Sequence, residues 1–180
     1  MKKLNLISTF LISIFMFSFC KKIFPDDNLS IQRENYSGNQ LRLDGYYYRY
    51  INEEYYFPKL FFYNNGVILE IGGRFKTFEE VEEYLNRIYI ENSNYNSNKL
   101  SWGVYRVEND NIKFEKWYPG SGGGFPAITR EGKILNDTTF HITQSYRMKN
   151  GKKREISAQD EIYHFKQFSP KPDSTNNFIR

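Results

Sequence analysis

The chain has 180 residues, a formal net charge of +4 and a single cysteine, Cys20. This length suits one domain, and one cysteine excludes a disulfide within the chain. The basic residues are scattered among acidic ones and form no continuous stripe, which argues against nucleic acid as a partner. Aromatic residues make up 18% of the chain and gather in short alternating runs, a pattern typical of β-strands.

The first nineteen residues have the pattern of a secretory signal peptide. Lys2 and Lys3 precede an apolar run over residues 4–19, which is too short for a membrane span of roughly 20 residues. The run ends at Cys20 and resembles a bacterial lipoprotein signal, in which the cysteine at the cleavage point is acylated. The alternatives are an uncleaved N-terminal anchor and an ordinary secreted protein with an incidental cysteine.

The lipoprotein resemblance implies that acyl chains on Cys20 hold the protein on a membrane of the bacterial cell envelope, with the outer membrane favoured. Several acyl chains bind a bilayer far more firmly than one chain does. Residues 20–40 are polar and predict a tether between the lipid and the domain. The domain itself is expected over residues 41–168, and residues 169–180 lack periodicity and predict a flexible tail.

Residues 41–50 predict the first strand of the domain. Two further strands, over residues 55–63 and 67–71, flank Asn-Asn-Gly at 64–66, and this tripeptide is a strong hairpin signal because Asn and Gly accept positive φ. One helix follows. Thr77 and Glu80 form a capping box, and an apolar stripe predicts a face packed on the sheet. The stripe consists of Phe78, Val81, Leu85 and Ile88.

Residues 100–118 give the clearest strand pattern, a hairpin that turns at residues 109–110. One of its faces is apolar and the other is mixed, which suits a sheet wrapped around a core. The register predicts four opposed pairs: Val107 with Ile112, Tyr105 with Phe114, Arg106 with Lys113, and Trp102 with Trp117.

Three more strands are expected toward the C-terminus. A weaker strand over residues 127–135 is interrupted at Glu131-Gly132, and a cleanly alternating strand covers residues 139–148. Asn150-Gly151 predicts a tight turn with basic residues around it, and residues 160–168 predict the last strand. In total we expect an all-β fold, an antiparallel up-and-down barrel of about eight strands with one helix, with a β-sandwich as the alternative.

The predicted domain also resembles bacterial lipocalin-like domains, the calycin type of barrel. The resemblance rests on Gly45-Tyr46-Tyr47 in the first strand, on the run from Phe61 to Gly66, on Trp102-Gly103-Val104-Tyr105, and on residues 132–137 before a long strand. Tyr47 stands where lipocalins usually have a tryptophan. This resemblance implies a cup for a small apolar molecule and no catalytic activity.

Catalysis needs a converging nucleophile, base and stabiliser, or a set of metal ligands. The glycine-rich stretch 119–124 is not followed by Lys-Ser or Lys-Thr, so it predicts a connection between strands and not a phosphate loop. His141 and His164 are the only histidines and make a thin metal site. We therefore predict no enzyme, no metal and no cofactor.

Two functions follow from the predicted barrel. In the first, its mouth binds a small apolar ligand, lined by Tyr105, Phe114, Phe140 and Ile142. In the second, its own aromatic side chains fill the interior, and outer rings make contacts with an envelope protein or assembly, because Tyr and Trp supply contact area at low entropic cost. Exposed rings could equally stack on sugars. The outer rings are Trp102, Trp117, Tyr46 and Tyr48.

Overall fold

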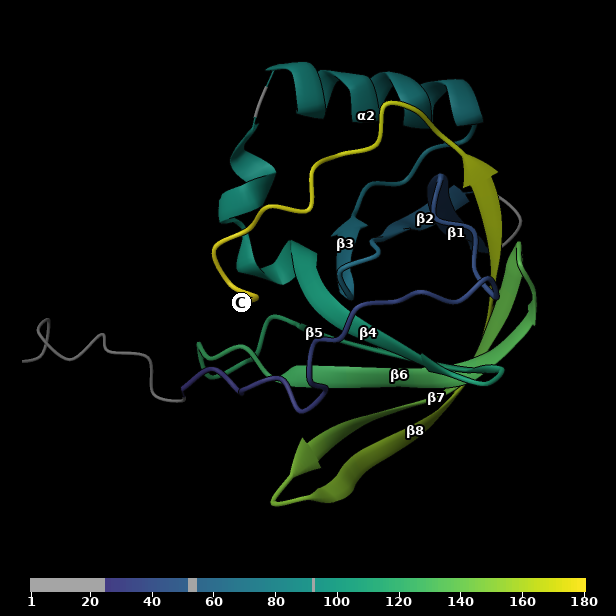
Figure 1. Ribbon diagram of the computed structural model, residues 1–180. Helices are drawn as coiled ribbons and strands as arrows, with labels where there is room; N and C mark the ends of the chain where they lie inside the picture. Colours follow the sequence, from purple (N-terminus) through teal and green to yellow (C-terminus); the bar gives the residue numbers. More distant parts are fainter. Residues whose placement is uncertain (1–24, 52–54, 92) are drawn as a thin grey trace, which may run out of the picture.

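Figure 1 shows the computed structural model of the protein, which describes residues 25–51, 55–91 and 93–180. Eight antiparallel strands form a closed barrel in which each strand pairs with its neighbours in sequence and β8 returns to β1. The predicted fold class is confirmed, and the sandwich alternative is wrong. The strands are β1 (Gly45–Ile51), β2 (Tyr55–Phe62), β3 (Val67–Ile71), β4 (Trp102–Glu108), β5 (Asn111–Trp117), β6 (Ala127–Asn136), β7 (Thr139–Lys149) and β8 (Lys152–Gln167).

The barrel closes where the first and last strands meet. The register of this pair runs from Gly45 opposite Gln167 to Tyr48 opposite His164. A Cβ atom at position 45 would lie 2.1 Å from the carbonyl oxygen of Lys166. Glycine is therefore required at the seam because only a residue without a side chain lets the two backbones approach so closely.

The hairpin register predicted from the sequence is confirmed. Val107 pairs with Ile112, Tyr105 with Phe114, and Arg106 with Lys113. The turn between these strands lies at residues 109–110, where Asn109 has a φ of 54°. The turn at residues 64–66 also forms, with a φ of 77° at Gly66. In each case a residue that accepts positive φ stands where the chain reverses.

One prediction of side-chain alternation is wrong. Residues 139–148 were expected to keep one face from Phe140 to Met148, but β7 has an irregularity between Ile142 and Gln144. Ile142 pairs with Gly132 on the inner side, whereas Gln144 pairs with Glu131. The extra residue shifts the alternation by one, so Tyr146 lies on the outer face, where its hydroxyl donates to Glu131.

One helix, α2 (Phe78–Glu91), and two short 3-10 helices, η1 (Ser93–Ser97) and η2 (Lys99–Ser101), connect β3 to β4. The predicted cap is present: the Glu80 amide donates to Thr77 Oγ1 at 3.2 Å, and the Glu80 carboxylate accepts from the Lys76 amide at 2.8 Å. Val81 and Leu85 are fully buried. Figure 1 shows the helix lying across one end of the barrel, and Val81 and Leu85 of its apolar stripe pack in one cluster with residues of the wall.

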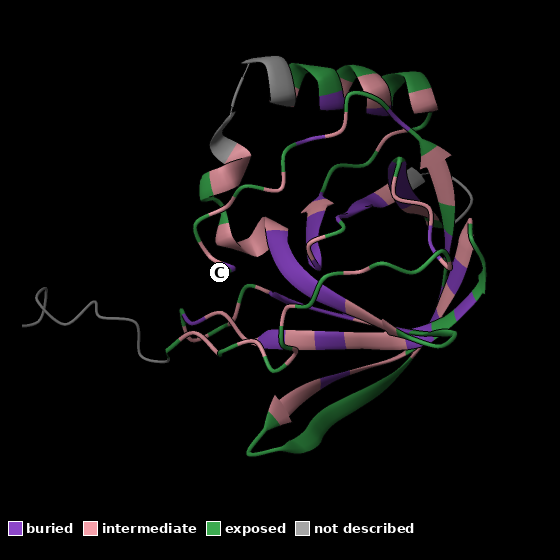
Figure 2. Cartoon of the chain, viewed as in Figure 1, coloured by how far each residue is buried: buried purple, intermediate pink, exposed green. Residues whose placement is uncertain are grey.

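Hydrophobic packing divides between the inside and the outside of the barrel wall. Figure 2 shows which parts of the chain are buried. We call the interior group the inner cluster and the group under α2 and the chain ends the outer cluster. The inner cluster consists of Leu41, Tyr47, Leu60, Phe62, Ile68, Tyr105, Ile112, Phe114, Ile134, Phe140, Ile142 and Tyr163. The outer cluster includes Tyr46, Phe61, Val67, Leu69, Val81, Leu85, Trp102, Val104, Trp117, Phe168 and Ile179.

The outer cluster corrects the prediction of exposed aromatic rings. Tyr46 and Trp102 are fully buried, and Trp117 is nearly so. The alternation placed these rings on the outer face correctly, but the helix and the chain ends cover that face. Tyr48 is partly buried, with its ring 5.1 Å from that of Phe78 in the helix. Sugar stacking on an open aromatic row therefore has no support here.

The C-terminal segment, expected to be flexible, packs along the barrel wall. Ile179 is buried in the outer cluster. The Lys171 ammonium donates to the carbonyl oxygens of Leu43 at 2.6 Å and Phe62 at 2.5 Å and lies over the Tyr63 ring. Burial lowers the pKa of Lys171 to about 8. These contacts tie the segment to one end of the barrel.

The described part of the predicted tether, residues 25–40, is also held on the wall. Glu115, on the outer side of β5, is buried and accepts hydrogen bonds from the amides of Ser30 at 2.5 Å and Ile31 at 2.9 Å. The Trp117 indole donates to the Asp27 carbonyl at 2.7 Å. The buried carboxylate is satisfied by backbone donors, which fixes the segment at a defined place on the wall.

Candidate binding site at the charged end of the barrel

A cavity of about 350 Å³ lies at the end of the barrel bounded by the loop after β5 and the 3-10 helix η2. Both apolar and charged side chains line it, and the charged ones come from four different strands. The apolar part of the rim includes Phe57, Pro58, Leu100 and Trp117. The charged part consists of Arg49 on β1, Glu70 on β3, Lys116 on β5 and Arg130 on β6.

Beneath the cavity, one carboxylate holds two arginines together. Glu161 on β8 forms an ion pair with Arg49, with Nη1 and Oε1 2.7 Å apart, and a second with Arg130 through its other oxygen. The Tyr163 hydroxyl donates to Glu161 Oε2 at 3.2 Å. Glu161 is almost completely buried. Because both carboxylate oxygens are occupied, the geometry of the two guanidinium groups is fixed from below.

A second ion pair lies nearer the wall formed by β3 and β5. Lys116 Nζ is 3.2 Å from Glu70 Oε1 and 4.1 Å from the centre of the Tyr118 ring. Burial lowers the pKa of Lys116, and the Glu70 carboxylate opposes that shift. Burial is the main cause that raises the pKa of the Tyr118 hydroxyl, and the negative charge of Glu70 raises it further. The lysine and the tyrosine thus share one acidic neighbour in a water-poor environment.

The charge and hydrogen-bond balance of this end is incomplete. Three cationic side chains, Arg49, Lys116 and Arg130, face two carboxylates, those of Glu70 and Glu161. Within the described residues, the buried Nε atoms of Arg49 and Arg130 contact no hydrogen-bond acceptor. A buried donor without an acceptor costs about 1–3 kcal/mol. The site therefore has a surplus of positive charge, which an anionic group in the cavity would balance.

The strand alternation explains why these residues point inward. Each charged residue stands two positions from a residue of the inner cluster or its lining: Arg49 after Tyr47, Glu70 after Ile68, Lys116 after Phe114, Arg130 before Gly132, and Glu161 before Tyr163. Residues two apart on a strand share a face. This group was not predicted from the sequence, although the same two-residue spacing indicates it.

The four residues predicted to line a ligand cavity lie elsewhere. Tyr105, Phe114, Phe140 and Ile142 are all buried in the inner cluster. The rings of Phe114 and Phe140 are 6.5 Å apart, and the Tyr105 hydroxyl donates to the Tyr63 carbonyl at 2.8 Å. The structure brings these residues together in the closely packed inner cluster, and none of them lines the charged cavity.

The remaining residues considered in the sequence are the predicted acylation site, Cys20, and the two histidines. Cys20 lies outside the described residues. His141 contacts Asp160, with Nε2 and Oδ1 2.7 Å apart, and the His164 ring lies 6.1 Å from that of Tyr48. Within the described part of the chain, no three His, Cys, Asp or Glu side chains come together as metal ligands.

None of the helices in the described segments has both the length and the apolar character needed to cross a bilayer. Comparisons of this chain with family models, with curated protein sequences and with solved structures gave no match.

Proposed function

We propose that the protein is a non-catalytic binding module, anchored to a bacterial envelope membrane through acylated Cys20, which takes a small amphipathic anion at the charged end of its barrel. The observation that carries the proposal is the surplus of cationic donors around Glu161, inside a cavity of about 350 Å³. Ligand cavities commonly measure about 300–1,000 Å³, so the occupant is small.

The packing of the barrel sets the shape of this ligand. The inner cluster fills the interior below Tyr163, so an apolar ligand has no room among Phe114, Phe140 and Ile142. The space that remains combines guanidinium groups with the apolar rim of Phe57, Leu100 and Trp117. A ligand with one anionic group and a short apolar body matches both surfaces, because guanidinium groups bind carboxylates and phosphates through paired hydrogen bonds.

The membrane anchor in this proposal comes from the sequence of residues 1–20. A positively charged start, a short apolar run and a cysteine at its end support acylation at Cys20. The outer membrane is the favoured location. The intact mass of the protein purified from bacterial membranes tests this part separately, since acylation adds the mass of the lipid to a chain that begins at Cys20.

A second candidate function has one observation in its favour. The aromatic filling of the inner cluster is what a barrel that serves as a structural subunit of an envelope assembly requires. In that case the charged end would be a contact surface and no small molecule would bind there. Mild crosslinking followed by recovery of a stable protein partner would favour this function over the first.

Binding of decanoate and decanol, measured by isothermal titration calorimetry, tests the ligand site. We expect decanoate to bind at least about tenfold more tightly than decanol, because only the carboxylate satisfies the arginine donors. Arg49→Gln should weaken decanoate binding, and Glu161→Gln should strengthen it, because it frees both guanidinium groups. Arg87→Gln on the exposed face of α2 is the control. Equal affinity for the two probes would contradict the proposal, as would a change of the same sign in both site variants.

A further inference from the structure

The hairpin of β7 and β8 projects beyond the barrel. β6 pairs with β7 only as far as Tyr146, and β1 pairs with β8 only from His164 onward. Beyond Tyr146, β7 and β8 pair only with each other and form a two-stranded ribbon. Figures 1 and 2 show this ribbon extending below the barrel with an exposed surface. The three residues from Arg147 to the turn add about 10 Å of length.

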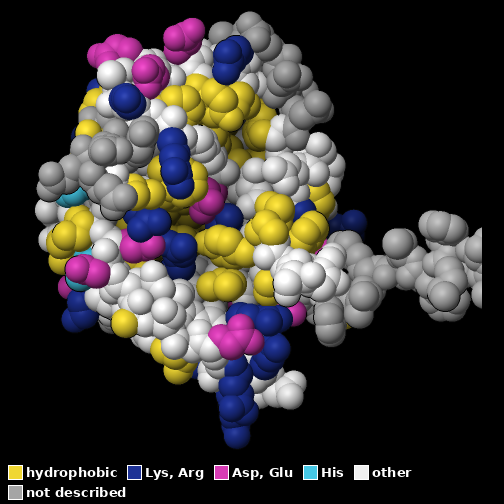
Figure 3. Space-filling model, turned by 180° about the vertical axis from the view of Figure 1, so that it is seen from behind, with side chains coloured by type: hydrophobic (Ala, Val, Ile, Leu, Met, Phe, Trp, Pro, Cys, Tyr) yellow, Lys and Arg dark blue, Asp and Glu magenta, His cyan; other side chains and the backbone are white. Residues whose placement is uncertain are grey.

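The projecting end is strongly basic. Four basic residues occupy six positions around the turn, and Figure 3 shows them as a column of positive side chains at the lower end of the molecule. These residues are Lys149, Lys152, Lys153 and Arg154.

The acidic groups near the hairpin neutralise only part of this charge. Glu131 contacts Lys153 at 2.8 Å, and Glu155 lies 3.4 Å from Arg147 and 3.7 Å from Lys149. In the described part of the chain, Lys152 and Arg154 form no ion pair. The opposite end of the molecule is acidic, because the outer face of α2 includes Glu79, Glu80, Glu82 and Glu83.

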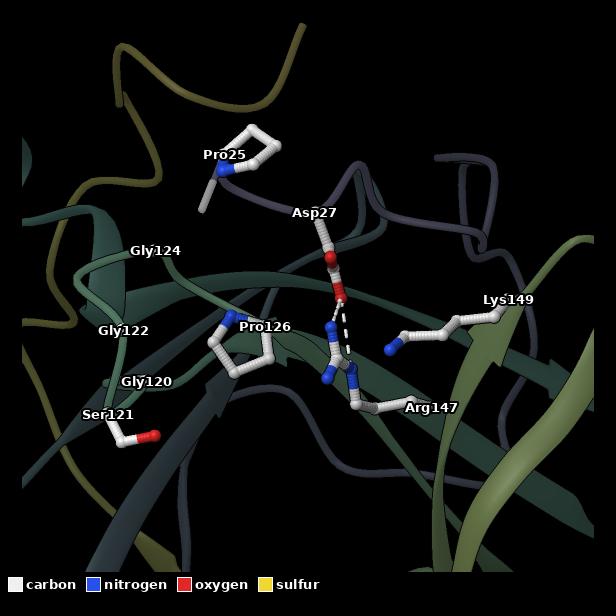
Figure 4. A pocket seen from close by; sticks show the side chains of 9 residues that line it. All are labelled: Pro25, Asp27, Gly120, Ser121, Gly122, Gly124, Pro126, Arg147 and Lys149. Carbon is white, nitrogen blue, oxygen red and sulfur yellow. Dashed lines mark hydrogen bonds and ion pairs between the residues drawn. The ribbon is translucent and has the colours of Figure 1, made fainter. Parts of the chain in front are cut away.

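The N-terminal segment reaches the barrel at the base of this hairpin. Asp27 pairs with Arg147, with Oδ2 and Nη2 2.7 Å apart. Pro25 lines a cavity of about 420 Å³ together with Lys149 and the glycine-rich loop at residues 120–124. Figure 4 shows the side chains of Lys149 and Arg147 extending toward the same space, across from the loop.

Covalent geometry connects this place to the membrane. Cys20 and Pro25 are five Cα–Cα steps apart in the sequence, and these steps span at most about 18 Å in any conformation. If Cys20 is acylated, Pro25 at the base of the hairpin lies within that distance of the bilayer, and the projecting ribbon covers about 10 Å of it. An anionic surface attracts lysines and arginines at this range and repels the acidic helix at the far end.

We propose that the basic end of the β7–β8 hairpin docks on the anionic headgroups of the bilayer that holds Cys20 and so fixes the orientation of the barrel. This inference rests on the membrane anchor of the proposed function. The exposed Ile156, at 62% of its full accessible area, lies beside the basic cluster and adds an apolar contact at the interface. The charged cavity of the barrel is a separate site.

Vesicle flotation of residues 20–180 with Cys20→Ser, the chain without the predicted signal peptide, tests the docking without an acyl anchor or the apolar run. We expect at least about tenfold more binding to vesicles with phosphatidylglycerol than to pure phosphatidylcholine vesicles, with the difference abolished at about 0.5 M NaCl. The triple variant Lys149→Gln, Lys152→Gln and Arg154→Gln should lose this difference. A matched variant, Arg74→Gln, Lys76→Gln and Arg87→Gln, removes the same charge around α2 and should retain it.

Equal losses in the two triple variants would overturn the proposal, because net charge and not the hairpin would then govern binding. The absence of a difference between the two vesicle types would also overturn it. Far-ultraviolet circular dichroism confirms that each variant is folded. Since flotation uses an unacylated chain, its result is independent of the mass measurement at Cys20, and failure of the docking is distinguishable from failure of the anchor.

Discussion

At one end of the barrel interior, the rings of Tyr47, Phe140 and Tyr163 pack together; at the other, Arg49 and Arg130 are held by Glu161. The same strands build both ends, and one step of two residues along a strand passes from the first to the second. Phe140 and Tyr163 are stacked with their ring centres 4.7 Å apart. The guanidinium groups, in contrast, retain unused donors.

This difference separates stability from recognition within one barrel. Closely packed aromatic rings contribute hydrophobic burial and have few alternative arrangements. A buried ion cluster contributes little net stability, because the desolvation of its charges offsets their attraction, but it gives strong preference for a complementary charge. Substitutions at the packed end should therefore mainly lower the free energy of unfolding. Substitutions at the charged end should have the larger effect on the affinity for the anionic ligand.

The largest effect is expected at the packed end. Phe140→Ala should lower the free energy of unfolding by about 4 kcal/mol, because it leaves a cavity between Tyr47 and Tyr163. Urea denaturation followed by tryptophan fluorescence measures this loss. Leu135→Ala on the exposed side of β6 is the control and should cost less than about 0.5 kcal/mol. A loss below about 1 kcal/mol for Phe140→Ala would show that the interior is not tightly packed.

At the charged end, Glu161→Gln should lower the free energy of unfolding by about 2–3 kcal/mol, since it leaves Arg49 and Arg130 without a counter-charge. The same variant should bind decanoate more tightly than the wild type. Asp160→Asn is a matched control, one position away with a side chain 90% exposed. If Glu161→Gln and Asp160→Asn had the same effect on binding, the two ends of the interior would not differ in function.

A buried lysine in the barrel wall should make the free energy of unfolding depend on pH. The Lys59 side chain is fully buried; its ammonium donates to the Gly73 carbonyl at 2.8 Å and lies over the Phe75 ring. Burial lowers its pKa from 10.5 to about 7, with the charge of Glu70 opposing the shift. Between these values the unfolded chain binds more protons than the folded chain, so the free energy of unfolding rises with pH.

We expect a gain of about 2 kcal/mol between pH 7 and pH 9.5, measured by urea denaturation across that range. Lys59→Met should reduce the rise to the part that Lys171 contributes, whereas Lys149→Met at the exposed hairpin should leave it unchanged. Above about pH 10 the stability should fall, because burial raises the pKa values of Tyr105 and Tyr163 and the unfolded chain ionises its tyrosines first. A stability that does not change from pH 7 to 9.5 would contradict a Lys59 whose pKa is lowered to about 7 by burial.

The smallest effect concerns the outer wall. Trp117→Phe should cost about 1 kcal/mol through loss of the hydrogen bond to Asp27. Hydrogen exchange should then increase in residues 25–31. Trp102→Phe removes the equivalent bond, to the Tyr95 carbonyl, and should leave exchange in that segment unchanged. If both variants loosened the segment equally, its attachment would depend on general packing and not on this bond.

Much of the fold follows from local patterns in the sequence. The register of β4 and β5, the turn at Gly66 and the cap at Thr77 each depend on residues close together in the chain. These features were predictable because turn residues and two-residue alternation act over short distances. The predicted interruption at Glu131-Gly132 is wrong: β6 runs unbroken through these residues, and the extra residue of the irregular pairing lies in β7.

What the sequence did not predict depends on distant contacts. The early part of β8 was missed because Lys152 to Ala158 has no apolar alternation, and this ribbon is exposed on both faces. The burial of Trp102 depends on chain segments far away in the sequence. The charged end was not predicted because its charged residues lie on five different strands. Only closure of the barrel brings five such side chains together.

The seam between β1 and β8 has a consequence for how the chain matures. β1 can pair with its second neighbour only after β8, the last strand, has been made. A chain that ends before β8 therefore leaves β1 and β7 with unpaired edges. Open edges pair readily with other molecules, and such distant pairing is slow to form. A chain that emerges from the ribosome with its amino end first therefore cannot close the barrel until its final strand has emerged, which leaves the longest interval in which chaperones can act.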